Sequence, residues 1–178
     1  GFSRPAWRCD IASRPFSWSK SGPDTRSSKP YQVMVVVDNV MKHEIKRTYR
    51  YRIYPNSEQR QELARTFGCS RWVYNWALET KTKAYYQDEE SLSFTDLSGR
   101  LTDKKRKEET EWLSEVSAVT LQQSLRNLNQ AFTNFFEGRA EYPSFKSKKG
   151  DQTARYVGTA FDIREENGKR KLRLSKMP

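Results

Sequence analysis

Histidine and cysteine are scarce in this sequence, and their scarcity excludes several kinds of site. His43 is the only histidine, so multi-histidine metal sites are excluded, and we interpret it as a solvated side chain rather than part of a catalytic triad. Cys9 and Cys69 are the only two cysteines, and they lack the spacing of a metal-binding pair. Because a disulfide framework needs more cysteines, the sequence indicates reduced thiols and a cytoplasmic location.

Long apolar runs and phosphate-binding loops are also missing. The longest apolar run, Val33 to Val37, is far too short to span a bilayer, and no stretch of signal-peptide length follows the first arginines. No GxxxxGK[ST] motif is present. The sequence therefore predicts neither a membrane partner nor a nucleotide-hydrolysing site of that type.

Acidic residues occur in pairs, but not in a pattern that predicts catalysis. Glu89-Glu90, Glu108-Glu109 and Glu165-Glu166 each lie in a hydrophilic stretch, where carboxylates usually balance nearby lysines. A two-metal nuclease needs acids that converge from separate strands, and Asp162 is only a weak candidate for such an acid. We predict no catalytic residue, no metal ligand and no cofactor in this chain.

The positive charge of the chain is its strongest bulk property. Its 33 Lys and Arg against 22 Asp and Glu give a net charge of +11 and a pI near 9.7, with a mean hydropathy of -0.98. A field of this sign attracts phosphate backbones, and counterion release then drives binding. The composition favours a nucleic-acid partner over an anionic membrane, an acidic protein or a merely solvated basic surface.

The first part of the chain divides into a lead and a strand. Residues 1–40 are rich in Ser, Pro, Arg and Lys, and we interpret them as a disordered lead that contains one short β-prone patch, Tyr31 to Val40. Ile45 to Tyr54 alternates apolar and basic residues, which predicts a half-buried strand within residues 41–56. Ser57 is the expected N-cap of the helix that follows.

Helices are predicted from residue 57 to residue 140. Two of them would meet at a Gly68-Cys69 corner and resemble a helix-turn-helix. Beyond a loop near Gln87 to Glu90, a short helix from Phe94 to Leu101 would be opened by Ser93 or Thr95, and Asp103 to Glu111 is interpreted as a solvated charge run. A long helix capped by Ser117 and stopped by Gly138 would bury a stripe at four- and three-residue spacing: Leu121, Leu125, Leu128, Phe132 and Phe135.

The remaining residues, 141–178, have a β pattern. Tyr156 to Ile163 and Lys171 to Leu174 are predicted strands, and the Asn167-Gly168 pair between them is the strongest short hairpin signal. One early strand, helices and a late hairpin predict an α+β fold. We expect a small sheet or barrel that is interrupted by a helical insertion.

Basic residues lie among aromatic residues in the positions expected of a nucleic-acid surface. Lysines and arginines would hold phosphates, and aromatic rings offer faces on which unpaired bases can stack. Tyr51, Phe132 and Phe135 are expected to be core instead, whereas Tyr156 could be either core or a stacking platform. The predicted backbone contacts are Arg50, Arg52, Lys146, Lys148, Lys149, Arg155, Lys171 and Arg173.

Several motifs together resemble one family. Tyr49-Arg50-Tyr51-Arg52-Ile53-Tyr54-Pro55 is followed by Phe67-Gly68-Cys69-Ser70-Arg71-Trp72-Val73-Tyr74-Asn75-Trp76, and later by Tyr142-Pro143-Ser144-Phe145-Lys146. In this order they are similar to the opening of TnpB (OrfB) proteins, the insertion-sequence relatives of compact type V CRISPR effectors. The resemblance runs from about Met41 to Met177. Since family members begin close to the arginine-rich strand, Met41 is a candidate true start and residues 1–40 a gene-model extension.

The resemblance implies a fold and partners. The expected fold is a partial wedge-type β-barrel, short of the strands that should follow, interrupted by a helical recognition lobe at residues 57–140. Together these parts are expected to grip a guide RNA and read a short motif in duplex DNA beside the target. The resemblance places motif reading near Phe94, Ser98, Gln122 and Thr159. Gln122 could pair with an adenine edge and Thr159 could contact a thymine, although Gln122 could equally be an ordinary exposed helix residue and Phe94 a core anchor.

The resemblance also implies what this chain lacks. Cutting in the family belongs to a RuvC-like domain with a zinc ribbon, and Mg²⁺ and Zn²⁺ are expected only there. Neither segment is recognisable in the sequence, so we expect a module that binds nucleic acid without cleaving it, truncated before the nuclease domain. A nuclease-dead RNA-guided repressor and a non-functional insertion-sequence remnant are the alternatives.

Overall fold

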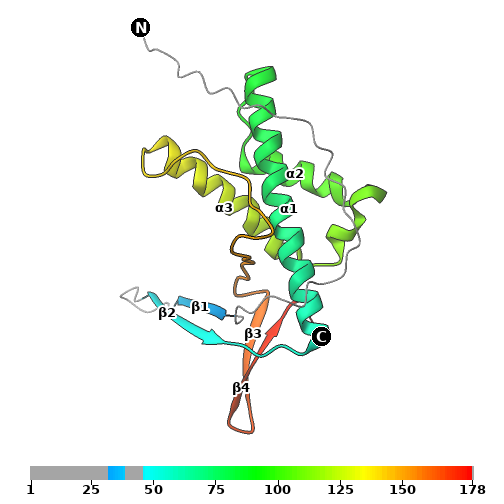
Figure 1. Cartoon of the computed structure of the whole chain (residues 1–178), viewed down its shortest axis with the longest axis vertical. Helices are drawn as coiled ribbons and strands as arrows, with labels where there is room; N and C mark the ends of the chain where they lie inside the picture. The colour runs from blue at the N-terminus through cyan, green and yellow to red at the C-terminus, as the bar shows by residue number, and fades with distance from the viewer. Residues whose placement is uncertain (1–31, 39–45, 178) are drawn as a thin grey trace.

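The computed structural model describes residues 32–38 and 46–177, and it has the predicted α+β composition (Figure 1). These residues form four strands, three α-helices and one short 3-10 helix. Their bounds are β1 Gln32–Asp38, β2 Lys46–Arg52, α1 Ser57–Asp88, α2 Phe94–Lys105, η1 Glu108–Ser114, α3 Ala118–Phe136, β3 Phe161–Glu166 and β4 Lys169–Leu174.

The first helix is continuous, so the predicted corner at Gly68-Cys69 is wrong. α1 runs through Gly68, which is buried, and the buried positions Cys69, Val73 and Ala77 follow it at helical spacing. A glycine inside a helix costs only about 1 kcal/mol relative to alanine, and burial of this face offsets that cost. The N-cap is Asn56, one residue before the predicted Ser57.

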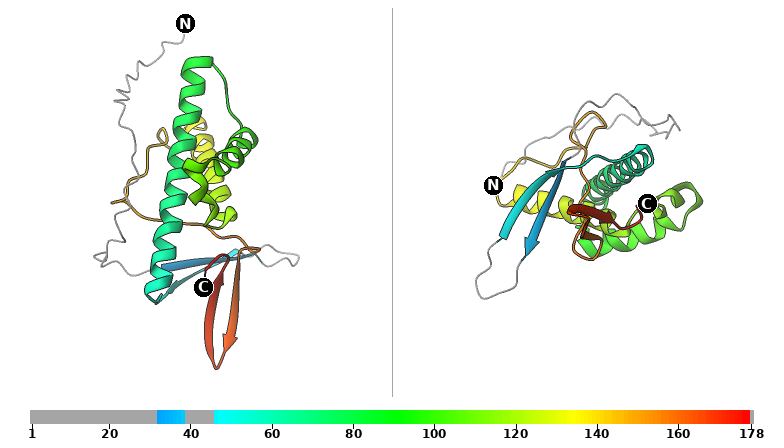
Figure 2. Two further views of the ribbon diagram at one scale, coloured as in Figure 1. Left: turned by 90° about the vertical axis from the view of Figure 1, so that its right-hand side faces the viewer. Right: turned by 90° about the horizontal axis from the view of Figure 1, so that it is seen from below.

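A leucine-rich core joins the three helices. α3 packs against α1, α2 packs against α3 and η1, and both α2 and α3 lie on one side of α1 (Figure 2). The predicted stripe of α3 is confirmed for Leu121, Leu125, Leu128 and Phe132, but Phe135 is only partly buried. Gly138 follows the end of α3 with φ of 70°, as the stop signal requires.

The segment between α1 and α3 is more ordered than its charge suggests. Ser93 caps α2 through a capping box with Asp96, as predicted, but the helix continues to Lys105. The expected solvated run from Asp103 to Glu111 instead contains the end of α2 and the start of η1. Thr110 is buried there, so the charge run also carries a packing residue.

The strands form two separate antiparallel pairs, β1-β2 and β3-β4, which lie near the N-terminal end of α1 (Figure 1). β1 lies in the predicted β-prone patch from Tyr31 to Val40. Because Gln32–Asp38 pair with β2 in full register, this patch is not part of a disordered lead. The Asn167-Gly168 turn is confirmed, with φ of 54° and 69°, whereas β3 begins at Phe161 rather than Tyr156. The described strands do not close a barrel.

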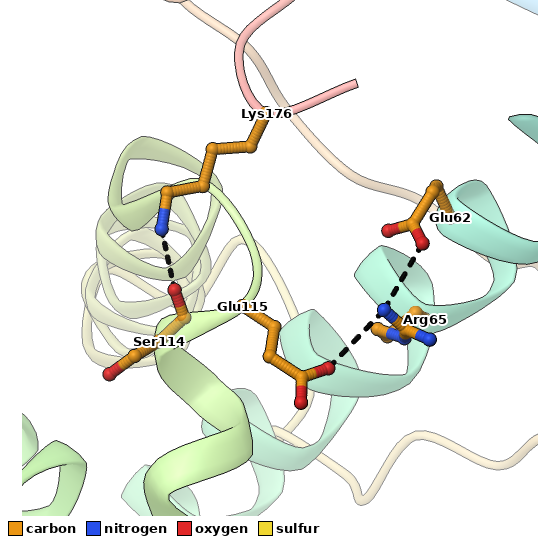
Figure 3. A network of polar contacts seen from close by, with 5 residues as sticks. All are labelled: Glu62, Arg65, Ser114, Glu115 and Lys176. Carbon is orange, nitrogen blue, oxygen red and sulfur yellow. Dashed lines mark hydrogen bonds and ion pairs between the residues drawn. The ribbon is translucent and has the colours of Figure 1, made fainter. Parts of the chain in front are cut away.

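A small polar network fastens the end of the second hairpin to the helices (Figure 3). Arg65 of α1 pairs with Glu62 at 3.1 Å and with Glu115 at 3.3 Å. Lys176, just after β4, donates to the backbone carbonyl of Ser114. The Arg65–Glu115 pair joins α1 to the residue after η1, and the Lys176–Ser114 bond holds the chain beyond β4 beside the end of η1.

Candidate nucleic-acid interface

Residues 141–156, which we call the strap, run antiparallel to α1 and are fastened to it at successive levels. The Tyr142 hydroxyl lies 2.9 Å from that of Thr82. Two turns further down α1, Asn75 donates to the backbone carbonyl of Lys146 at 2.9 Å and accepts from its N–H at 2.8 Å. These contacts cover much of the length of the helix, so α1 determines the path of the strap.

Lys146 is fixed by its side chain as well as its backbone. Its Nζ lies 4.3 Å from the centroid of the Tyr74 ring, a cation–π contact. Burial against this ring lowers the pKa of Lys146 below its usual range. Tyr74 and Asn75 come from one recognised motif and Lys146 from another, so the fold brings the two motifs into contact. Lys146 therefore acts here as an anchor of the strap.

The strap forms a tight turn from Ser147 to Gly150 that Gln152 closes. The Gln152 side-chain amide donates to the carbonyls of Ser147, Lys148 and Gly150 at 2.9–3.1 Å. Its carbonyl oxygen accepts from the guanidinium of Arg71 on α1. Backbone groups of the turn are thus satisfied internally, and the turn is held at a fixed place on the helix.

The strap presents cations to solvent, two in this turn and one beyond it. Lys148, Lys149 and Arg155 are exposed, and none of them forms an ion pair with another described residue. Cations that have no ion-pair partner and lie on a fixed backbone are suited to phosphate contacts, because no existing ion pair has to be broken before a phosphate binds.

Tyr156, the proposed stacking residue, is half-buried against α1. Burial raises the pKa of its hydroxyl, and a hydrogen bond with Thr66 opposes that rise. The ring therefore serves the packing of the strap, and stacking on it stays a prediction.

The cations of the two hairpins differ in their surroundings. Lys171 pairs with Glu166, and Arg173 lies opposite Asp162 in the strand register. Asp162, the weak acid candidate, is exposed and bonded to Arg164 at 2.8 Å, which lowers its pKa. Arg52 is exposed at the end of β2. Arg50 faces Met34 across the β1-β2 pair, and its side chain lies outside the described residues.

A second group of side chains joins α2 to α3. The Gln122 amide donates to the Ser98 hydroxyl at 2.9 Å, and Arg126 lies over the Phe94 ring at 5.2 Å from its centroid. The structure therefore brings three of the four predicted motif-reading residues together. Thr159 is exposed in a separate turn just before β3.

Sequence reasoning missed Arg71, Gln152 and Arg126 as members of these two groups. Arg126 lies one helical turn after Gln122, and this spacing could have indicated a shared face. The Arg71–Gln152 contact joins residues far apart in sequence, and no local pattern indicates it.

Within residues 32–38 and 46–177, no group of three or more His, Cys, Asp or Glu side chains is placed to hold a metal ion. No helix in this part of the chain is long and apolar enough to cross a membrane.

Comparison with known proteins places the chain in a family. The helix-turn-helix domain of OrfB proteins of the IS605 type matches residues 41–90, which contain β2 and α1. A protein of Streptomyces pristinaespiralis named as an RNA-guided DNA endonuclease is 50% identical over 125 residues, and InsQ of Escherichia coli K12, with the same description, is 31% identical over 108 residues. Virulence protein VsdF of Salmonella dublin is 36% identical over 107 residues, which cover 90% of that protein.

The chain belongs to the TnpB (OrfB) family. The matches cover 70% of this TnpB-family chain for the Streptomyces relative, 61% for InsQ and 55% for VsdF. The chain spans only 31% and 27% of the length of the first two relatives. The similarity therefore supports a nucleic-acid-binding, transposon-associated protein and covers a minor part of each endonuclease.

Proposed function

We propose that this chain is the N-terminal module of a TnpB-type RNA-guided protein, which holds a guide RNA and reads a short motif in target-adjacent duplex DNA. The observation that carries the proposal is the strap: it is fastened to α1 and presents Lys148, Lys149 and Arg155, which have no acidic partner among the described residues. Exposed cations on a fixed segment suit contacts with the phosphates of a folded RNA.

Motif reading is assigned to the α2–α3 face. Ser98 fixes the orientation of the Gln122 amide, and a preset amide can donate to and accept from an adenine edge without first being ordered. Arg126 beside Phe94 adds a cation for the neighbouring backbone. The competing interpretation is that the Ser98–Gln122 bond only joins two helices.

The two hairpins are assigned to a wedge-type barrel. Both pairs lie near the same end of α1, and each has two strand edges that could accept further strands (Figure 1). The proposal assigns no cleavage reaction, metal or cofactor to residues 1–178. Cutting, where the full-length relatives perform it, would need residues outside the region matched here.

The test is recovery of RNA from cells that express the chain. Ultraviolet crosslinking, purification and sequencing are expected to yield one enriched structured RNA. The matched control is the Lys148→Ala/Lys149→Ala variant. It leaves the two Asn75–Lys146 hydrogen bonds in place and should recover much less of this RNA. Equal, unselective recovery of cellular RNA by both proteins would contradict a guide-RNA function.

A further inference from the structure

A shallow depression lies where the strap crosses α1 and α3. Ser70 of α1, Asn127 of α3 and Arg155 of the strap line it, together with Arg71 and Lys146. Three elements distant in sequence thus contribute polar side chains to one small site.

Ser70 is the unusual member of this site. It is 3% exposed, and its Oγ is buried without a hydrogen-bond partner among the described residues. Other helix hydroxyls bond back to the preceding turn: Thr80 to the carbonyl of Trp76 at 2.8 Å and Ser124 to that of Thr120 at 3.1 Å. A buried hydroxyl left unpaired is destabilising, so Ser70 has a donor that the folded chain alone does not use.

The charge around the depression favours an anionic ligand. Arg71, Lys146 and Arg155 line it against a single acid, Asp151, which itself has an interaction partner. Arg155 forms no ion pair with another described residue, and Asn127 can contribute an amide donor. Donors and excess positive charge around a small polar site suit a tetrahedral oxyanion.

We propose that the depression between Ser70, Asn127 and Arg155 binds one phosphate group of a nucleic-acid strand that crosses the strap. This deepens the proposed function and rests on it: Lys148 and Lys149 would supply diffuse attraction, whereas this site would fix the register of one phosphate. Binding would satisfy the Ser70 hydroxyl, which the chain alone leaves unpaired.

The test uses the full chain and an RNA hairpin in which single linkages are replaced, one at a time, by neutral methylphosphonate. Wild type should lose about tenfold in affinity at one linkage in particular. Ser70→Ala and Arg155→Gln should bind the unmodified hairpin about tenfold more weakly and be insensitive to that substitution. Arg106→Gln, which removes the same charge at the end of α2, should behave like wild type.

Stability measurements separate this role from a structural one. Ser70→Ala should melt at the wild-type temperature or above it, because it removes an unpaired buried hydroxyl. A lower melting temperature with unchanged RNA affinity would overturn the proposal and indicate a hydroxyl satisfied by water.

Three further outcomes show whether the phosphate comes from a nucleic acid or from solution, and whether the phosphate site alone or the whole proposed function fails. Stabilisation of wild type by inorganic phosphate, without any sensitive linkage in the hairpin, would overturn the nucleic-acid site in favour of a free-phosphate site. If Lys148→Ala/Lys149→Ala weakens RNA binding while Ser70→Ala and Arg155→Gln do not, the phosphate site fails and the proposed function stands. If none of these variants weakens binding, both fail.

Discussion

Asn75 and Lys146 are joined by two reciprocal hydrogen bonds, of 2.9 and 2.8 Å, although 71 residues separate them in the sequence. The Asn75 amide pairs with the backbone of Lys146 much as a neighbouring strand would. Because both backbone groups of one residue are engaged, this contact fixes the position and the direction of the strap at the point where its cationic turn begins.

Replacing Asn75 should loosen the strap. Asn75→Ala removes both bonds, and we expect a loss of about 1–2 kcal/mol in the free energy of unfolding together with weaker RNA binding. Urea denaturation and RNA titration measure the two effects. Asn129→Ala, a substitution of the same kind on the exposed part of α3, is the control and should change neither. Wild-type RNA affinity in Asn75→Ala would show that the Asn75–Lys146 hydrogen bonds do not organise the binding surface.

The α2–α3 face should determine which DNA sequence is preferred. In a selection from a motif-randomised duplex by the RNA-loaded chain, Gln122→Ala and Thr159→Ala should each relax the enriched motif at one position, since each removes one proposed base contact. A double-mutant cycle between Ser98→Ala and Gln122→Ala should give a coupling of roughly 1 kcal/mol in stability. If both single variants enrich the wild-type motif with the same strength, these residues do not read DNA.

Sequence patterns predict the elements that are determined by residues close together in the chain. The leucine stripe of α3 and the Asn167-Gly168 turn were predicted because helical spacing and positive φ leave direct traces in residue choice. The corner at Gly68 was wrong because burial of the flanking residues outweighs the helix cost of one glycine. The strap could not be predicted, since its path depends on contacts such as Asn75–Lys146 that have no periodicity.

Removing residues 1–40 should expose the edge of β2. The deletion removes β1, which pairs with β2 from Gln32–Arg52 to Asp38–Lys46. We expect faster amide hydrogen exchange across Lys46–Arg52, while exchange in α1 and α3 stays at its wild-type rate because these two helices pack on each other and on α2 and η1. Unchanged exchange in β2 would mean that the pairing contributes nothing to its stability.

The Cys69 thiol should be inert in the folded chain. Burial, the largest cause, raises its pKa to about 12, so the native state keeps a proton that the unfolded chain releases near pH 8.5. This contribution to stability is complete below about pH 8.5 and is lost as the pH rises toward 12. In a Cys9→Ser chain, Ellman's reagent should label Cys69 at the rate of unfolding. Labelling as fast as in denaturant would contradict the burial of this thiol.

The salt dependence of RNA binding tests the central claim, that the strap presents phosphate-binding cations, most directly. The slope of log affinity against log salt is measured for wild type, Lys148→Ala/Lys149→Ala and the control Arg106→Ala/Lys107→Ala, which removes the same charge at the end of α2. The account predicts a slope shallower by about two units in the strap variant, one for each lost phosphate contact, and an unchanged slope in the control. A strap variant with the wild-type slope, or an equal loss in the control, would contradict it.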